Sequence, residues 1–260
     1  MEIETSEISK SYDDTKILQD VSIRVQNNQF VGIIGPNGSG KSTFLKCIYR
    51  VLKPDHGAVY VDGQELLKMP VKESAKKIAV VAQHNYYNFD FKIEEVVMMG
   101  RSPHKKAMER DNAEDDRIVN ECIEKVGMTR FKGRSFSTLS GGEQQRIILA
   151  RALAQQTPCI ILDEPTNHLD IKYQLQLLDI VKDLDVTVIS AIHDLNIAAM
   201  YCDYLYAMQD GDIIASGTPR EILTADLVRR LYEVEADVAP DPNGFVHVIY
   251  YPKHLLKADT

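Results

Sequence analysis

The chain has 260 residues, 44% of them hydrophobic, which is enough for one large domain with a substantial core or for two small ones. Its 30 basic and 38 acidic residues give a net charge of −8, which argues against non-specific nucleic-acid binding, because such binding depends on lysine and arginine neutralising phosphates. The four cysteines lie far apart and form no C-x-x-C pair, which argues against a zinc site or a disulfide framework and is typical of a reducing compartment.

The N-terminal sequence MEIETSEISK is acidic and alternating, unlike a secretory signal. No run in the chain approaches the roughly 18–20 apolar residues that a membrane-spanning helix needs. We therefore expect a chain that is soluble by itself and that acts on a membrane only through a partner.

The first sixty residues predict two kinds of strand. Residues 3–8, 17–25 and 58–61 alternate between apolar and polar side chains, as expected for an antiparallel sheet. Residues 30–34 (FVGII) are continuously apolar, which is typical of a parallel strand covered on both faces. A glycine-rich turn follows this strand, and then a helix is expected from residue 42 to about residue 50.

The middle of the chain predicts a charged helical insertion from about residue 93 to about residue 137. A further helix is expected over residues 144–155, followed by two more continuously apolar strands at residues 159–162 and 186–192. Within the insertion, one helical face should be apolar, because five residues recur at helical spacing: Ile118, Val119, Cys122, Ile123 and Val126.

This repetition of strand, loop and helix predicts an α/β fold with a mostly parallel central sheet. Ligands of such sheets bind at the carboxyl ends of the strands, where the three apolar strands meet polar or glycine-rich residues. Near the C-terminus, a helix at residues 225–231 precedes a predicted hairpin of residues 233–238 and 245–250. We expect a main domain of residues 1–220 that contains the insertion, and an extension of residues 221–260.

Residues 35–42, GPNGSGKS, match the phosphate-binding pattern G-x-x-x-x-G-K-[ST]. The glycines allow backbone N–H groups to turn toward phosphate oxygens, and the next helix points its positive end at them. Lys41 would reach the β- and γ-phosphates, and Ser42 would hold Mg²⁺. Kinases and GTPases share this pattern, so it predicts only a nucleoside triphosphate. The predicted binding residues are Gly35, Pro36, Asn37, Gly38, Ser39, Gly40, Lys41, Ser42 and Thr43.

An acidic pair, Asp163 and Glu164, ends the second apolar strand. Asp163 can hold Mg²⁺ directly or through water, and Glu164 can accept a proton from the attacking water or orient it. Such a pair is often only a solvated turn or a helix cap. The phosphate-binding pattern upstream favours the catalytic interpretation.

A capping box explains only part of residues 139–146, LSGGEQQR. Ser140 and Glu143 fit a capping box that opens a helix. The capping box does not explain Gly141 and Gly142, because two glycines at the start of a helix cost stability. They make sense if a phosphate approaches the helix N-terminus closely.

The sequence LSGGEQQR, lying between the phosphate-binding pattern and Asp163, resembles the signature of the ATP-binding-cassette (ABC) family, and the resemblance covers residues 2–217. It implies a P-loop ATPase fold with an N-terminal antiparallel β-subdomain and a helical insertion, and the cofactors ATP and Mg²⁺. It also implies a homodimer in which each ATP lies between the phosphate loop of one copy and Ser140, Gly141 and Gly142 of the other.

The same resemblance implies roles for four further residues. Tyr12 would stack on adenine, and Gln83 would sense Mg²⁺ and the transmembrane partner. Asp170 would lie in the loop that crosses the dimer interface, and His193 would contact the γ-phosphate. Taken singly, each has an ordinary alternative, and Asp194 beside His193 could be only the N-cap of the next helix.

Three more stretches resemble the ATPase subunits of importers for iron–siderophore complexes, haem and cobalamin. They are residues 99–104 (MGRSPH), residues 168–171 (HLDI) with Gln174, and residues 193–199 (HDLNIAA). The resemblance implies two permease subunits, an extracytoplasmic binding protein, no nucleic acid, and a peripheral location at the cytoplasmic face of the cell membrane. Four aromatic residues could dock the permease or simply pack on the core: Tyr86, Tyr87, Phe89 and Phe91.

Several alternatives remain open at the level of sequence. Zinc and manganese importer subunits share part of the pattern, and an exporter subunit is also compatible with it. A cassette ATPase of translation or DNA repair fits less well, because the chain has one cassette, no C-x-x-C pair and no heptad repeat. A small-molecule P-loop kinase would not need the LSGG sequence.

Overall fold

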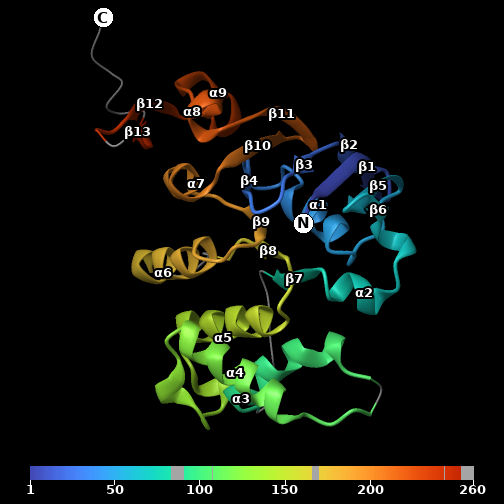
Figure 1. Cartoon of the computed structure of the whole chain (residues 1–260). Coiled ribbons are helices and arrows are strands. Elements are labelled where there is room, and N and C mark those ends of the chain that lie inside the picture. Colours follow the sequence, from blue (N-terminus) through green and yellow to red (C-terminus); the bar gives the residue numbers. More distant parts are fainter. Residues whose placement is uncertain (83–90, 107, 166–169, 243, 253–260) are drawn as a thin grey trace, which may run out of the picture. The chain divides into compact units, whose positions relative to one another are not determined.

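The computed structural model describes residues 1–82, 91–106, 108–165, 170–242 and 244–252, and the chain divides into two compact units. The first unit comprises Met1 and Lys68–Val188, and the second comprises Glu2–Leu67 and Ile189–Thr260. Figure 1 labels their elements. The boundary falls inside one strand, β9 (Thr187–Ala191), so each unit contains part of it.

The second unit begins with an antiparallel sheet, as the alternating pattern predicted. Its longest strand, β1, pairs antiparallel with β2, β3 and β5, and β5 continues to β6. The predicted strand at residues 17–25 is in fact parts of two strands, because pairing stops between residues 21 and 24. The strands are β1 (Ile3–Tyr12), β2 (Thr15–Val21), β3 (Arg24–Val25), β5 (His56–Val61) and β6 (Gln64–Glu65).

The second unit also holds the strand that leads into the phosphate-binding sequence. This strand, β4 (Phe30–Ile34), is buried at all five positions and is followed by α1 (Lys41–Ile48). On one side it pairs in parallel with β10 (Tyr204–Gln209), which pairs antiparallel with β11 (Asp212–Gly217). On the other side lie residues 189–191 of β9, which lead into α7 (Leu195–Tyr201). Neither β10 nor β11 was expected from the sequence.

The first unit pairs β7 (Ile78–Val81) in parallel with β8 (Cys159–Asp163). At the start of β9, the Thr187 N–H donates to the carbonyl of Pro158 at 3.0 Å. The helices α3, α4 and α5 pack against one another (green and yellow-green in Figure 1). The remaining bounds are α2 (Val71–Ala75), α3 (Ile93–Met98), α4 (Ala113–Lys125), α5 (Gly141–Ala154) and α6 (Ile171–Lys182), with the short 3₁₀ helices η1 (Leu66–Lys68, which begins in the second unit), η2 (Met99–His104), η3 (Thr129–Phe131) and η4 (Phe136–Thr138).

The apolar face predicted for the insertion is confirmed on α4. Ile118, Val119, Cys122 and Ile123 are all buried on this helix, and Val126 is buried just after its end. The start predicted for α5 at residue 144 is wrong, because Ser140 is the N-cap and the helix begins at Gly141. The carboxylate of Glu143 accepts hydrogen bonds from both the backbone N–H and the Oγ of Ser140, each at 2.9 Å.

The C-terminal extension contains two short helices and the predicted hairpin. These are α8 (Pro219–Ile222), α9 (Ala225–Tyr232) and the antiparallel strands β12 (Glu235–Pro240) and β13 (Val246–Tyr251). The hairpin is fixed to α7, because the side-chain amide of Asn196 donates to the Val248 carbonyl at 3.1 Å and accepts from the Val248 N–H at 2.8 Å.

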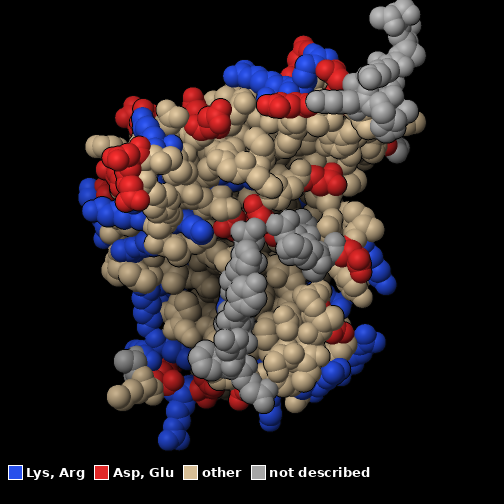
Figure 2. Space-filling model, turned by 180° about the vertical axis from the view of Figure 1, so that it is seen from behind, with Lys and Arg blue, Asp and Glu red and all other residues tan. Residues whose placement is uncertain are grey.

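The described surface carries charges of both signs. Figure 2 shows, on one face, basic and acidic side chains interspersed rather than gathered into one basic band. Within the described ranges, no helix has the length and apolar character to cross a membrane. The four cysteines are buried and form no disulfide.

Candidate nucleotide site

The phosphate-binding sequence forms the turn between β4 and α1. Gly38 and Gly40 have φ angles of 82° and 102°, in the left-handed region that favours glycine. A Cβ at Gly38 would meet nothing within 4 Å, so there is open space beside the backbone there. A Cβ at Gly35 would lie 2.1 Å from the carbonyl oxygen of Met208, so Gly35 permits close packing of the turn against β10.

Two polar side chains in this turn suit an anionic ligand. Lys41 is only 4% exposed, and its Nζ donates to the carbonyl oxygens of Gly35 and Pro36 at 2.8 Å each. The Oγ of Ser39 is buried and has no hydrogen-bond partner among the described residues. A buried ammonium, an unused hydroxyl and open space beside a glycine backbone, all at the N-terminus of α1, fit the phosphates of a nucleotide.

The turn between β10 and β11 supports the phosphate loop, a role that the sequence analysis missed. The N–H of Gly211 donates to the Ser39 carbonyl at 3.0 Å, and the Gly211 carbonyl accepts from the N–H of Gln19 at 2.8 Å. The Gln19 side chain also donates to the Asp210 carbonyl at 2.9 Å. The signal was present, since the sequence QDGD between two apolar runs is typical of a hairpin turn.

His193 shares a cleft with two residues of the phosphate loop. It follows β9 and lines a cleft of about 490 Å³ together with Pro36 and Asn37. The Asp194 carboxylate caps α7, because its Oδ1 accepts from the N–H groups of Asn196 and Ile197 at 2.8 and 3.2 Å. Tyr12, at the end of β1, is 48% exposed, so its ring is accessible, but it does not line this cleft.

In the first unit, the acidic pair lies at the carboxyl end of β8. Asp163 is 2% exposed at the carboxyl end of β8. Glu164 follows it with a φ of 52°, an uncommon conformation for a residue that is not glycine. Strained backbone of this kind is concentrated at functional sites.

The signature residues of the first unit lie at an accessible helix start. Gly141 is exposed in the first turn of α5, and a Cβ there would meet nothing within 4 Å. Packing within the unit therefore does not require glycine at this position. Asp170 occupies the N-cap position of α6. Outside the described residues lie Gln83, Tyr86, Tyr87, Phe89 and residues 167–169.

Comparison with known proteins shows similarity to ATP-binding subunits of importers. A family described as ABC transporter matches residues 18–167. The chain is 39% identical to a cobalamin import ATP-binding protein of Halobacterium salinarum over 95% of its own length, but it spans only 63% of that relative. It is 36% identical to an iron(3+)-hydroxamate import ATP-binding protein of Bacillus subtilis, with 92% of this chain and 91% of the relative covered.

Solved structures show the same fold over almost the whole chain. A transporter assigned to the metal-chelate type, in an inward-facing conformation, has a chain that is 25% identical with a TM-score of 0.84, covering 97% of this chain and 98% of that one. A cassette solved as a dimer with ADP and phosphate is 30% identical with a TM-score of 0.74, covering 85% of this chain and 100% of that one. These matches confirm the predicted family and fold: the chain belongs to the ABC transporter family and is built on an ATP-binding cassette.

Proposed function

We propose that this chain hydrolyses Mg·ATP to drive the import of a metal chelate through separate permease subunits. The phosphate loop carries the nucleotide part of the proposal, because Lys41, the unused Ser39 hydroxyl and the open backbone at Gly38 fit phosphates. The import part is supported by relatives that are named as import ATP-binding proteins.

The residues predicted from the sequence divide the chemistry among them. Lys41 exchanges the carbonyls of Gly35 and Pro36 for β- and γ-phosphate oxygens. Ser42, Asp163 and Gln83 would hold Mg²⁺, which would supply positive charge next to the phosphates.

Other residues act on the attacking water, the γ-phosphate and the adenine. Glu164 takes a proton from the water or orients it, and His193 contacts the γ-phosphate from the wall of the cleft that it shares with Asn37. Tyr12 stacks on the adenine with its exposed ring.

A second copy of the chain completes each site in this proposal. Ser140, Gly141 and Gly142 face the phosphate loop of the partner copy, and Asp170 lies at the interface between the copies. The exposed, unfilled position at Gly141 supports this arrangement, and so does the cassette that was solved as a dimer. Two permease subunits bind the pair at the cytoplasmic face of the membrane, and an extracytoplasmic binding protein delivers the cargo.

Among possible cargoes, we favour an iron chelate. The hydroxamate relative aligns with this chain over about nine-tenths of both lengths, whereas the cobalamin relative extends well beyond the match. Cobalamin, haem, zinc or manganese import and export remain the alternatives to be separated by experiment.

Growth of a deletion strain separates these alternatives. The strain should fail to grow when an iron(III)–hydroxamate is the only iron source, and the wild-type gene should restore growth. Glu164→Gln should not restore it, because the variant lacks the proton acceptor, whereas Tyr251→Phe in the C-terminal hairpin should. A defect only with cobalamin or only under zinc limitation would reassign the cargo. Normal uptake of every chelate by the deletion strain would refute an import role.

A further inference from the structure

Asp55 lies beside the strand that ends at Tyr12, in the second unit. Its backbone N–H donates to the Ser9 carbonyl at 2.9 Å. Its carboxylate accepts from the Lys10 Nζ at 2.7 Å and from the Ser11 N–H at 2.8 Å. These hydrogen bonds from Lys10 and Ser11 hold the pKa of Asp55 below its usual 3.8, so the carboxylate is ionised at neutral pH. Asp55 therefore contacts the three consecutive residues of β1 that precede Tyr12.

These contacts continue the support of β1 past the end of its strand partner. The pairing of β1 with β5 ends at Ser9 and His56. Beyond that pair, the carboxylate of Asp55 accepts the Ser11 N–H, a backbone group of the kind that a neighbouring strand would otherwise bond. The ring of Tyr12 is 48% exposed, so packing holds it only in part. Its position therefore depends on the backbone that carries it.

The hairpin that carries Tyr12 packs on the phosphate loop. Tyr12 pairs with Thr15 of β2. A Cβ at Gly40 would lie 2.9 Å from the Cδ2 of Leu18 and 3.1 Å from the carbonyl oxygen of Ile17, both in β2. Strand residues advance about 3.4 Å each, so roughly 7 to 10 Å of strand separates these contacts from the partner of Tyr12. A nucleotide whose phosphates lie in the loop can therefore bring its base to Tyr12.

Asp55 is also attached to the helix that begins at the phosphate loop. It ends the segment that follows α1, residues 49–55. This segment folds back on the helix, because the N–H groups of Val51 and Leu52 both donate to the Lys46 carbonyl at 2.9 Å. A segment held in this way can place one carboxylate reproducibly, and it links the end of β1 to α1.

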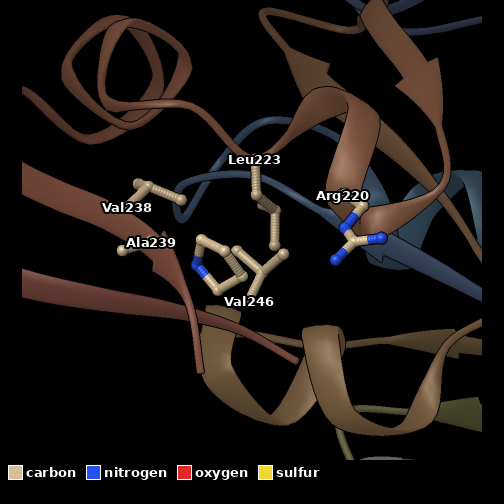
Figure 3. A pocket seen from close by; sticks show the side chains of 6 residues that line it. Arg220, Leu223, Val238, Ala239 and Val246 are labelled. Atoms are coloured by element: carbon tan, nitrogen blue, oxygen red, sulfur yellow. The ribbon is translucent and has the colours of Figure 1, made fainter. Parts of the chain in front are cut away.

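A pocket elsewhere in the second unit is a poor alternative for the base. It lies where the C-terminal hairpin meets α8, and Figure 3 shows Leu223 and Val246 directed into the same space. Its volume is about 100 Å³, well below the several hundred Å³ of typical small-molecule sites. An exposed aromatic ring such as that of Tyr12 suits a planar base better.

We propose that Asp55 is a positioning residue for adenine binding, because it fixes the end of β1 and thereby the ring of Tyr12. This rests on the proposed stacking of Tyr12 on adenine. A ring that is already held in its binding position loses less conformational freedom when the nucleotide arrives, so the affinity is higher.

The test measures the Kd for MgADP in the purified full-length chain by calorimetric titration. Asp55→Ala should raise this Kd about three- to tenfold, because it removes the hydrogen bonds that the carboxylate accepts from β1. Tyr12→Ala should raise it at least as much. The double variant should bind no more weakly than Tyr12→Ala alone, because the two residues act through one contact.

Asp62→Ala is the matched control. The Asp62 carboxylate accepts the Glu2 N–H at 2.9 Å, beside the other end of β1. The variant therefore removes the same kind of contact from the same sheet without touching the strand end at Tyr12. Its Kd for MgADP should equal that of the wild type, even if the fold becomes less stable.

A fluorescent reporter tests the positioning directly. The chain has no tryptophan, so Tyr12→Trp places a single one at the stacking position. In the nucleotide-free protein, adding Asp55→Ala should lower the fluorescence anisotropy of that tryptophan, because the end of β1 becomes more mobile, whereas adding Asp62→Ala should not. If Asp55→Ala is too unstable to assay, Asp55→Asn replaces it in both experiments. A rise in Kd of at least about twofold is then expected, because the hydrogen bonds lose their charge assistance.

Several outcomes would overturn the proposal. An unchanged Kd in Asp55→Ala, or an equal rise in Asp62→Ala, would show that this contact does not serve the nucleotide. Additive losses in the double variant, or unchanged anisotropy, would mean that Asp55 does not act through Tyr12. Wild-type affinity in Tyr12→Ala would end the stacking role and the positioning role with it. Wild-type affinity in Lys41→Ala would instead refute the nucleotide site itself, which separates the two failures.

Discussion

Lys41 illustrates how a buried cation can keep a loop ready for its ligand. Lys41 is only 4% exposed, and its Nζ donates to the carbonyl oxygens of Gly35 and Pro36 at 2.8 Å each. An anionic phosphate oxygen accepts a stronger hydrogen bond from an ammonium group than a neutral carbonyl does, so we expect phosphate to displace these carbonyls in the proposed site.

Lys41→Ala should abolish hydrolysis and weaken ATP binding while leaving the domain folded. A hydrogen bond to a charged group contributes about 1.5–3 kcal/mol, so the affinity for Mg·ATP should fall roughly 10- to 150-fold. Calorimetric titration measures the affinity, and phosphate release measures turnover. Circular dichroism serves as the control for folding. Wild-type turnover in this variant, with contaminating ATPase excluded, would contradict the assignment of the site.

At the scale of elements, residues 99–104 (MGRSPH) pack η2 against the helices α4 and α5 of the first unit. A Cβ at Gly100 would lie 2.2 Å from the carbonyl oxygen of Arg151, so η2 packs directly on the backbone of α5. The Arg101 guanidinium is buried, donates to Asp115 of α4 at 3.0 Å and donates to the Ala154 carbonyl, at the end of α5, at 2.8 Å. Arg101 therefore links the two helices that support the signature.

Arg101→Leu should lower the free energy of unfolding by about 3–5 kcal/mol, because it leaves the buried Asp115 carboxylate with a less complete set of partners. Arg117→Leu, on the same helix, is the matched control: Arg117 pairs with Glu114 and Glu121 in exposed positions, so little or no change is expected. Urea denaturation followed by circular dichroism measures both variants. Equal losses of stability in the two would show that burial of the Arg101 pair is unimportant.

The stability difference between wild type and Arg101→Leu should also depend on pH. Burial by itself raises the pKa of Asp115, but hydrogen bonds from Arg101 and Lys105 outweigh it and hold the pKa below the usual 3.8. A carboxyl with a lowered pKa stabilises the fold above its unfolded value, and this contribution is lost as the pH falls through the folded value. Urea midpoints of the two proteins should therefore converge below pH 3.8. A difference that stays constant across that range would argue against the ion pair.

The sequence predicted elements well where the signal is local. Continuous apolar runs identified β4, β8 and β9, and helical spacing identified the buried face of α4. It failed for β10 and β11, although QDGD marks their turn. The helix was expected over residues 144–155, but it begins three residues earlier, because Ser140 is the N-cap and Gly141 and Gly142 lie in the first turn.

The candidate site could be predicted only in part, because only the phosphate loop is contained in one short segment of the sequence. The spacing of GPNGSGKS is contained in one short segment, so the sequence alone revealed the phosphate loop. The groups that surround the loop, such as Met208, Gly211 and Tyr232, come from the distant C-terminal part of the chain. Nothing in a local pattern indicates which distant segments will meet, because tertiary packing decides it.

At the scale of the whole molecule, the signature supports the proposal that a second copy completes each site. The first turn of α5 presents an exposed glycine whose lack of a side chain is not required by packing within its unit. A ligand that approaches from outside the unit accounts for it. In a two-fold dimer the two interfaces are equivalent, so each signature would face the phosphate loop of the other copy.

Mixed dimers of two inactive variants test this arrangement. Lys41→Ala disables the phosphate loop and Ser140→Arg blocks the signature, so a mixed dimer has one site with both defects and one site with neither. Random coexpression makes about half of the dimers mixed, and roughly a quarter of wild-type ATPase activity should return if the sites act independently. Coexpression is preferable to mixing purified proteins, because slow subunit exchange would hide the recovery.

Activity that never exceeds that of either parent would leave two explanations: both sites must be intact together, or Ser140 serves its own chain. Cysteines at positions 38 and 140 separate them, since a disulfide between chains supports the shared site and a disulfide only within one chain refutes it.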